Sequence, residues 1–253
     1  GIDRDGTNGV DAPQTGSPTR VFDAPTWNPP PGTGVGTPPG DDPLTTQAQR
    51  GAVIHMFYTM NVYHDKLYEL GFTEAFENFQ NDNFGRGGVA ADRISSEGQD
   101  SSGTNNANFS TPADGGRGRM QMFLWTGPTP DYDGTADTEV VIHEVTHGTS
   151  TRLHNGLGNQ GGMMGEGWSD WYGHTMLAQA ADPINSISTT GGYATFQLGG
   201  MTSNYYYGIR KWPKAVKSFT GGPARPGCGD QPCPHNPLSF RHINTGCFTE
   251  LGS

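Results

Sequence analysis

Long hydrophobic runs and basic residues are both scarce in this sequence. Only 32% of the 253 residues are hydrophobic, and no apolar run reaches the roughly 18 residues that mark a membrane-spanning helix. Lys and Arg total 15 against 25 Asp and Glu, which gives a formal net charge of −10. Because nucleic acids and anionic membranes attract basic surfaces, we expect neither nucleic acid nor a membrane as a partner.

Cysteine is scarce as well. The three cysteines, Cys228, Cys233 and Cys247, all lie in the last 26 residues. Cys228 and Cys233 are close enough for a short disulfide loop in an oxidising compartment. Metal binding by these thiols is the weaker alternative, because no second pair of cysteines accompanies them. The odd count leaves one thiol without a partner.

Glycine (39) and proline (19) are abundant, which favours a loop-rich fold over a compact helical bundle. They are concentrated near the start of the chain, where proline opposes long helices and central strands. We therefore predict an extended arm over residues 1–48. The large apolar side chains of Val21, Phe22 and Trp27 predict that this arm is ordered and lies on the main body.

Regular periodicity begins after the arm. Apolar residues recur every three or four positions over residues 45–70, with threonines to cap the start and a glycine after the end, which predicts a helix. His55 and His64 on this helix are interpreted as structural. Residues 76–110 predict short strands and turns, and the apolar run at 120–125 predicts a further strand.

The most informative motif is V-V-I-H-E-V-T-H-G at residues 140–148. His143 and His147 stand four apart, so on a helix both imidazoles project from one face. Two imidazoles at that spacing can hold one tetrahedral Zn²⁺. Glu144 points about a quarter-turn away, where it can act on a metal-bound water without being a ligand. The pentapeptide alone also occurs by chance on amphipathic helices.

A second segment, M-G-E-G-W-S-D-W-Y at residues 164–172, completes the predicted site. If it opens a second helix, Glu166 can supply the third protein ligand and leave a fourth position for water. Asp170 lies one turn on, where it can accept the outer N–H of a ligand histidine. The alternative is a carboxylate placed near a helix N-terminus for its dipole. Together the parts predict a zinc hydrolase.

These segments resemble those of the fungalysin family of secreted zinc metallopeptidases and, more distantly, thermolysin. The resemblance keeps the family order from about residue 52 to residue 212 and is more specific than any single motif. The matching segments are N-V-Y-H-D-K-L-Y-E-L-G-F, G-T-N-N-A-N-F-S-T-P-A-D-G, R-M-Q-M-F-L-W, V-V-I-H-E-V-T-H-G and M-G-E-G-W-S-D-W-Y.

The resemblance implies an α+β, thermolysin-like zincin, in which a strand-rich N-terminal part and a helical C-terminal part flank the zinc helix. We expect three parts: the Pro/Gly-rich arm at 1–48, an N-terminal catalytic subdomain at 49–150 and a helical C-terminal subdomain at 151–253. In the thermolysin-like pattern an edge strand beside the zinc binds the substrate backbone. The matching pair here is Asn106 and Ala107.

The resemblance also implies a secreted, extracellular zinc endopeptidase of the gluzincin type, with one Zn²⁺ and with protein or peptide substrates. It implies a zymogen with an N-terminal propeptide. Ca²⁺ is a minor expectation, since thermolysin-like enzymes often bind it near the zinc site and oxygen-rich loops suit it. The acidic residues at 131–139 of this chain form such a loop. Arg210, in a Tyr-Gly-Ile-Arg run, is a weaker candidate for binding a substrate carbonyl.

At its C-terminal end the chain departs from the family pattern. Fungalysins carry a His-Asn-x-Gly-Glu-x-Trp segment after an N-P-L-S-F stretch. That stretch is residues 236–240 here, and the sequence ends 13 residues later without the segment. We therefore expect a C-terminally truncated peptidase. His242 is a low-ranking candidate for the donor that stabilises the tetrahedral oxyanion.

Two other functions stay open on the sequence alone. One is a zinc-bearing fold that binds peptide but cleaves it weakly or not at all, because its C-terminal part is missing. The other is a metal-assisted hydrolase of something other than peptides, which the match at Asn106 and Ala107 disfavours.

Overall fold

The computed structural model describes residues 1–7, 9, 21–22, 27–30, 40–154, 160–210, 212–215 and 222–223. Its α-helices are α1 Thr46–Glu69, α2 Thr138–His154, α3 Gln160–Leu177 and the short α4 Asn204–Tyr207. Its strands are β1 Ser95–Gly98, β2 Ala107–Ser110, β3 Arg119–Met122, β4 Leu124–Trp125, β5 Tyr132–Asp133, β6 Ile187–Ser188 and β7 Lys214–Ala215. Single 3₁₀ turns are η1 Glu74–Phe76, η2 Gly134–Ala136 and η3 Leu198–Gly200. Long helices with small sheets make an α+β fold, as the family resemblance implies.

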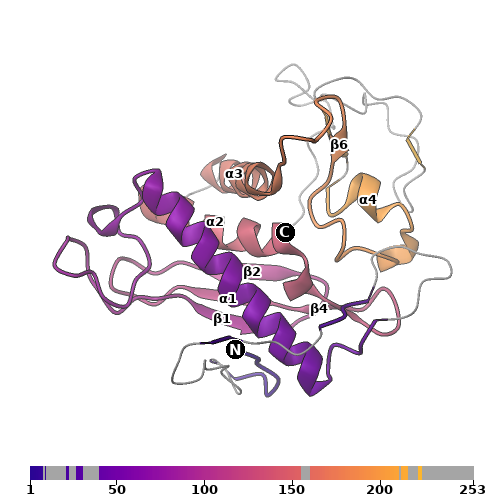
Figure 1. Cartoon of the computed structure of the whole chain (residues 1–253), viewed down its shortest axis with the longest axis horizontal. Helices are drawn as coiled ribbons and strands as arrows, with labels where there is room; N and C mark the ends of the chain where they lie inside the picture. Colours follow the sequence, from indigo (N-terminus) through magenta and orange to yellow (C-terminus); the bar gives the residue numbers. More distant parts are fainter. Residues whose placement is uncertain are drawn as a thin grey trace.

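The largest sheet has three strands in the order β1–β3–β2, with β1 parallel and β2 antiparallel to β3. Alternate side chains of a strand point to opposite faces, so Met120, Met122 and Ala107 share one face of this sheet. They pack in one core with Met56 of α1 and Val141 of α2. Figure 1 shows α1 crossing in front of the sheet. Helices α2 and α3 lie higher in the same view than the sheet. This arrangement leaves β2 at an edge of the sheet.

The helix predicted over residues 45–70 is α1. Thr45 caps its start, because the Thr45 side chain accepts a hydrogen bond from the backbone N–H of Ala48. The buried side chains of α1, including Met56, Tyr63 and Leu67, recur at helical spacing. Burial of this one face against the sheet and α2 stabilises the helix.

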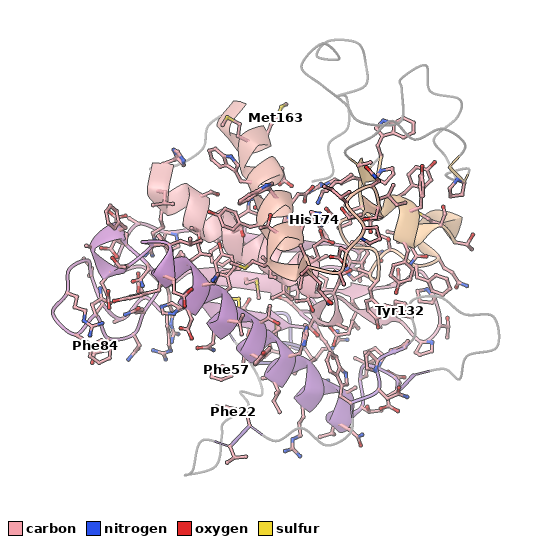
Figure 2. All side chains as sticks on the ribbon, turned by 45° about the horizontal axis from the view of Figure 1, so that its top comes forward. Phe22, Phe57, Phe84, Tyr132, Met163 and His174 are labelled. Carbon is pink, nitrogen blue, oxygen red and sulfur yellow. The ribbon has the colours of Figure 1, made fainter. Side chains whose placement is uncertain are left out.

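Two residues of the N-terminal arm, Phe22 and Trp27, pack against α1. The rings of Phe22 and Phe57 have centroids 4.4 Å apart (Figure 2). Trp27 packs beside His55 and so close to Gly51 that a Cβ there would lie 2.3 Å from the indole ring. Val21, in contrast, is 58% exposed. The prediction that the arm's large apolar groups pack is therefore confirmed for Phe22 and Trp27 and wrong for Val21.

Two elements differ in extent from their predictions. The predicted strand at 120–125 is two strands, because β3 pairs within the main sheet whereas β4 pairs with β5. Helix α3 begins at Gln160, before the predicted start at Glu166. Its glycine-rich first turns have low intrinsic helix propensity, and packing of α3 against α2 supplies the stability instead.

Helix α2 continues through residue 150 to His154, across the boundary expected between the second and third parts. The three-part division therefore stays a prediction. In the described part of the chain, no helix is both long and apolar enough to cross a membrane.

Candidate metal centre

Helices α2 and α3 bring together the three predicted ligands. His143 Nε2 and His147 Nε2 lie 3.0 Å apart, as expected for side chains one turn apart on α2. Glu166, on α3, places Oε2 3.2 Å from His143 Nε2 and Oε1 3.4 Å from His147 Nε2. The three potential ligand atoms all lie within 4.8 Å of one another.

Asp170 sets the orientation of His143. Its Oδ1 lies 2.8 Å from His143 Nδ1. An ionised carboxylate only accepts hydrogen bonds, so Nδ1 must donate and the lone pair of a neutral ring lies on Nε2. Two imidazole nitrogens and one carboxylate are a donor set that suits Zn²⁺ and leaves a further position open. The residues present therefore fit the metal that the motif predicts.

Arg210 holds the two carboxylates of the site in place. Its Nε and one terminal nitrogen donate to Asp170 at 2.8 and 2.7 Å, and the same terminal nitrogen lies 3.1 Å from Glu166 Oε2. Lys214 Nζ donates to the Asp170 carbonyl at 3.3 Å. The Tyr-Gly-Ile-Arg run drew attention to Arg210 only as a substrate contact. Its role beside Asp170 was missed, because no spacing pattern links the two residues.

The ionisable groups of the site shift one another's pKa values. Burial lowers the pKa of His143, but its hydrogen bonds to Asp170 and Glu166 outweigh burial and raise that pKa to about 9. Burial would raise the pKa of Glu166, yet the hydrogen bonds from His143 and His147 hold it well below its usual range. Asp170 is likewise held low, against burial, by Arg210 and His143. The centre thus places anionic carboxylates around two imidazoles and favours a cation.

Glu144 is buried beside the three potential ligands but does not belong to their group. Burial raises the pKa of its carboxyl group, and the neighbouring His143 and His147 oppose that rise. Within the described part of the chain no hydrogen bond occupies the Glu144 carboxylate. Glu144 also lines the cleft into which the site opens, and its role as a base for water stays a prediction.

The site opens into a cleft of about 840 Å³. The potential ligands and Glu144 line one part of it, and residues 104–109 line another. In this segment the Asn105 side chain accepts a hydrogen bond from the Thr126 backbone N–H at 2.7 Å. Asn106 is exposed, and Ala107 begins the edge strand β2. The structure therefore brings Asn106 and Ala107 to the same cleft as the potential ligands.

The other candidates do not join this group. His55 Nε2 lies 3.0 Å from Thr138 Oγ1, so it makes a structural contact between α1 and α2. The acids at 131–139 form no group of three potential ligands within the described residues. Asp137, for example, accepts the backbone N–H groups of Tyr193 and Ala194 at 3.1 and 3.0 Å. The minor expectation of Ca²⁺ there gains no support.

Four residues singled out from the sequence lie outside the described residues: His242 and the cysteines Cys228, Cys233 and Cys247. The oxyanion role of His242 and the disulfide between Cys228 and Cys233 stay predictions.

An α+β fold that carries two histidines one turn apart on one helix and a glutamate on the next defines a zincin-type protein. The model of the fungalysin metallopeptidase family matches residues 16–218, and the chain belongs to that family.

Relatives of known name support this assignment. The chain is 39% identical over 201 residues to the extracellular metalloproteinase mep of Aspergillus fumigatus, covering 77% of this chain and 28% of the relative. It is 45% identical over 200 residues to the mep protein of Aspergillus flavus, covering 76% and 28%. It is also 45% identical over 176 residues to extracellular metalloproteinase 2 of Arthroderma gypseum, covering 67% and 27%. The chain thus matches between a quarter and a third of these relatives' length.

Proposed function

We propose that this protein is an extracellular zinc endopeptidase of the gluzincin type, which hydrolyses peptide bonds in proteins or peptides. One observation carries the proposal: the atoms of His143, His147 and Glu166 converge within 4.8 Å in a cleft that the edge strand β2 also lines. Extracellular location rests on the names of the relatives. A precursor with an N-terminal propeptide stays a prediction.

In this proposal His143, His147 and Glu166 hold Zn²⁺, which when bound supplies Lewis-acid polarisation of the scissile carbonyl. Glu144 takes the proton of the attacking water and later delivers it to the nitrogen of the leaving amine. Its buried position suits this role, because a desolvated carboxylate is a stronger base than one in water. Asp170 keeps the His143 ring in the orientation that binds metal.

The substrate would bind as an extended strand along β2. An edge strand has backbone N–H and C=O groups on one side that no neighbouring strand uses, and a peptide can pair with them. The exposed Asn106 would contact that peptide through its amide. Such main-chain recognition orients the scissile bond with little dependence on side-chain identity.

The decisive experiment replaces Glu144 by Gln. Because the substitution removes the base and no ligand, Glu144→Gln should retain one zinc per chain and lose at least about 100-fold in turnover of an unstructured protein. Zinc is counted by elemental analysis, and cleavage by release of new amino termini. Loss of zinc from this variant, or unchanged turnover, would contradict the role of Glu144.

The wild-type chain provides the test of the activity itself. If the zinc-loaded wild type binds an extended peptide but does not cleave it, the alternative of a peptide-binding zinc fold replaces the peptidase. If chelation leaves cleavage by the wild type unchanged, the metal has no part in the reaction.

A further inference from the structure

A second group of potential ligands lies away from the metal centre. Oxygen atoms of Asp3, Glu97 and Asp100 lie within 4.8 Å of one another, and all three residues are at most 1% exposed. Glu97 is on β1 and Asp100 follows that strand. Asp3 belongs to the arm, and its backbone N–H donates to the carbonyl of Gly98 at 3.0 Å. The group therefore joins the first residues of the chain to the main sheet.

Among the described residues, Glu97 Oε2 has no hydrogen-bond donor. Glu97 Oε1 accepts the backbone N–H of Gly9 at 3.2 Å, and Asp100 Oδ1 accepts that of Ser102 at 2.7 Å. Glu97 Oε2 is shielded from solvent and accepts no hydrogen bond within the described part of the chain. Arg119 Nε lies 3.9 Å from it, which is too far for a hydrogen bond. A buried carboxylate oxygen in this state is destabilising unless something else binds it.

Positive charge that could balance the three carboxylates is also limited among the described residues. Within that part of the chain, Arg119, whose side chain is a third exposed, and the amino group of Gly1, which interacts with Glu97 and Asp3, offer at most two charges against three carboxylates. The amino group of Gly1 donates to the carbonyl of Ser96 at 2.8 Å. Carboxylates this close repel one another strongly when buried, and buried charges in proteins are normally paired or bound to metal.

We propose that Asp3, Glu97 and Asp100 bind one Ca²⁺. The three side chains offer only oxygen, which suits a hard cation and not the nitrogen and sulfur preference of Zn²⁺. Ca²⁺ accepts several protein oxygens in flexible geometry, whereas Mg²⁺ usually keeps several waters, for which a buried site has little room. The ion fastens the arm to β1, and with it the sheet that carries β2. The inference is independent of peptidase activity.

The test uses the whole chain with its metal centre loaded. The protein is stripped with EDTA, desalted, reloaded with one equivalent of Zn²⁺ and titrated with Ca²⁺. Equilibrium dialysis should find one Ca²⁺ per chain, and the Tm from circular dichroism should rise by about 3 °C or more at saturation. Mg²⁺ at equal concentration should raise it less. No bound Ca²⁺, or an equal response to Mg²⁺, would overturn the proposal.

Two variants locate the ion. Glu97→Gln should bind Ca²⁺ at least about tenfold more weakly, because charge count sets the affinity of such sites. Without Ca²⁺ its Tm should equal or exceed that of the wild type, because one of three mutually repelling charges is gone. A Tm lowered equally with and without Ca²⁺ would make Glu97 structural only. Asp100→Asn should show the same loss of affinity, and unchanged Ca²⁺ binding in either variant would overturn the proposal.

Glu74→Gln is the matched control. Glu74 is also a buried glutamate, 2% exposed, but it accepts hydrogen bonds from Tyr68 and Gln80 and lies outside the group. This variant should keep the full Ca²⁺ response. Loss of that response in Glu74→Gln as well would show that the effect of Glu97→Gln is not specific to the site.

Discussion

Asp170 accepts one hydrogen bond from His143 and two from the guanidinium group of Arg210. A bidentate guanidinium contact fixes both the position and the plane of a carboxylate. The fixed carboxylate in turn fixes the ring of a predicted metal ligand. The orientation of His143 Nε2 therefore depends on Arg210, which follows α4 and lies outside the helices α2 and α3 that carry the predicted ligands.

Asp170→Ala should weaken zinc affinity about 10- to 100-fold, because His143 loses the acceptor that orients it. A competition titration against a chromogenic chelator measures the change. Asp65→Ala, which removes an exposed acid from α1, is the control and should leave the affinity unchanged. An unchanged affinity in Asp170→Ala would show that Asp170 does not support zinc binding.

The adjacent Asn105 and Asn106 should separate structure from substrate binding. Asn106→Ala should lower kcat/KM for short peptides at unchanged zinc content and Tm, because Asn106 is exposed and lines the cleft. Asn105→Ala should lower the Tm instead, since the Asn105 side chain holds Thr126. Parallel peptide kinetics and thermal melts check both. Normal kinetics in Asn106→Ala would make that asparagine a turn residue only.

At the scale of elements, α2 is anchored through its last turn. The side chain of Arg152 is 1% exposed. It donates to Asp92 Oδ2 at 2.6 Å and to the carbonyls of Glu77 and Gly116, both at 2.8 Å. Its guanidinium lies 4.0 Å from the centroid of the Phe79 ring. These contacts tie the loops after α1 and after β2 to the helix that carries both histidines.

Arg152→Met should lower the free energy of unfolding by about 3–5 kcal/mol, because it leaves Asp92 as a buried charge without its partner. Urea unfolding measures the loss. The exposed Arg93→Met is the control and should change stability by less than about 0.5 kcal/mol. Adding Asp92→Asn to Arg152→Met should recover part of the loss. Equal losses in the two single variants would contradict the anchoring role.

Because Trp27 of the arm packs against α1, the effect of replacing Gly51 in that helix can be predicted. In an ordinary helix interior, Gly→Ala stabilises by about 1 kcal/mol. Gly51→Ala should destabilise instead, because its Cβ would lie 2.3 Å from the Trp27 ring. In a Trp27→Ala background the same change should become stabilising. Thermal melts of the four proteins form a double-mutant cycle, and no coupling between the two sites would show that the arm does not pack there.

At the scale of the whole molecule, the predicted ligands come from two helices, so metal binding should stabilise the fold. Removal of zinc with 1,10-phenanthroline, which binds Ca²⁺ poorly, should lower the Tm on the order of 10 °C for a metal present at about 1,000 times its Kd. Added Zn²⁺ should restore the Tm. Glu166→Ala should respond much less, because one ligand is already lost. An equal response would place the stabilising metal elsewhere.

Local patterns in the sequence were sufficient to predict which residues lie together at much of the candidate site. The helix over residues 45–70 and the placement of His143, Glu144 and His147 depend on residues three or four apart. Side-chain periodicity records such relations directly. Glu166 followed from its motif, although α3 starts earlier than predicted. The sequence by itself therefore determined the residue types at the centre and the helices that carry them.

Tertiary structure alone decided what surrounds those residues. Arg210 reaches Asp170 across 40 positions and Glu166 across 44. The arm brings Asp3 to Glu97 and Asp100, and the packing of α3 on α2 allows a helix to begin in glycine-rich sequence. These relations join segments that are far apart in the chain. Their geometry comes from the packing of whole elements on a shared core, which no local periodicity encodes.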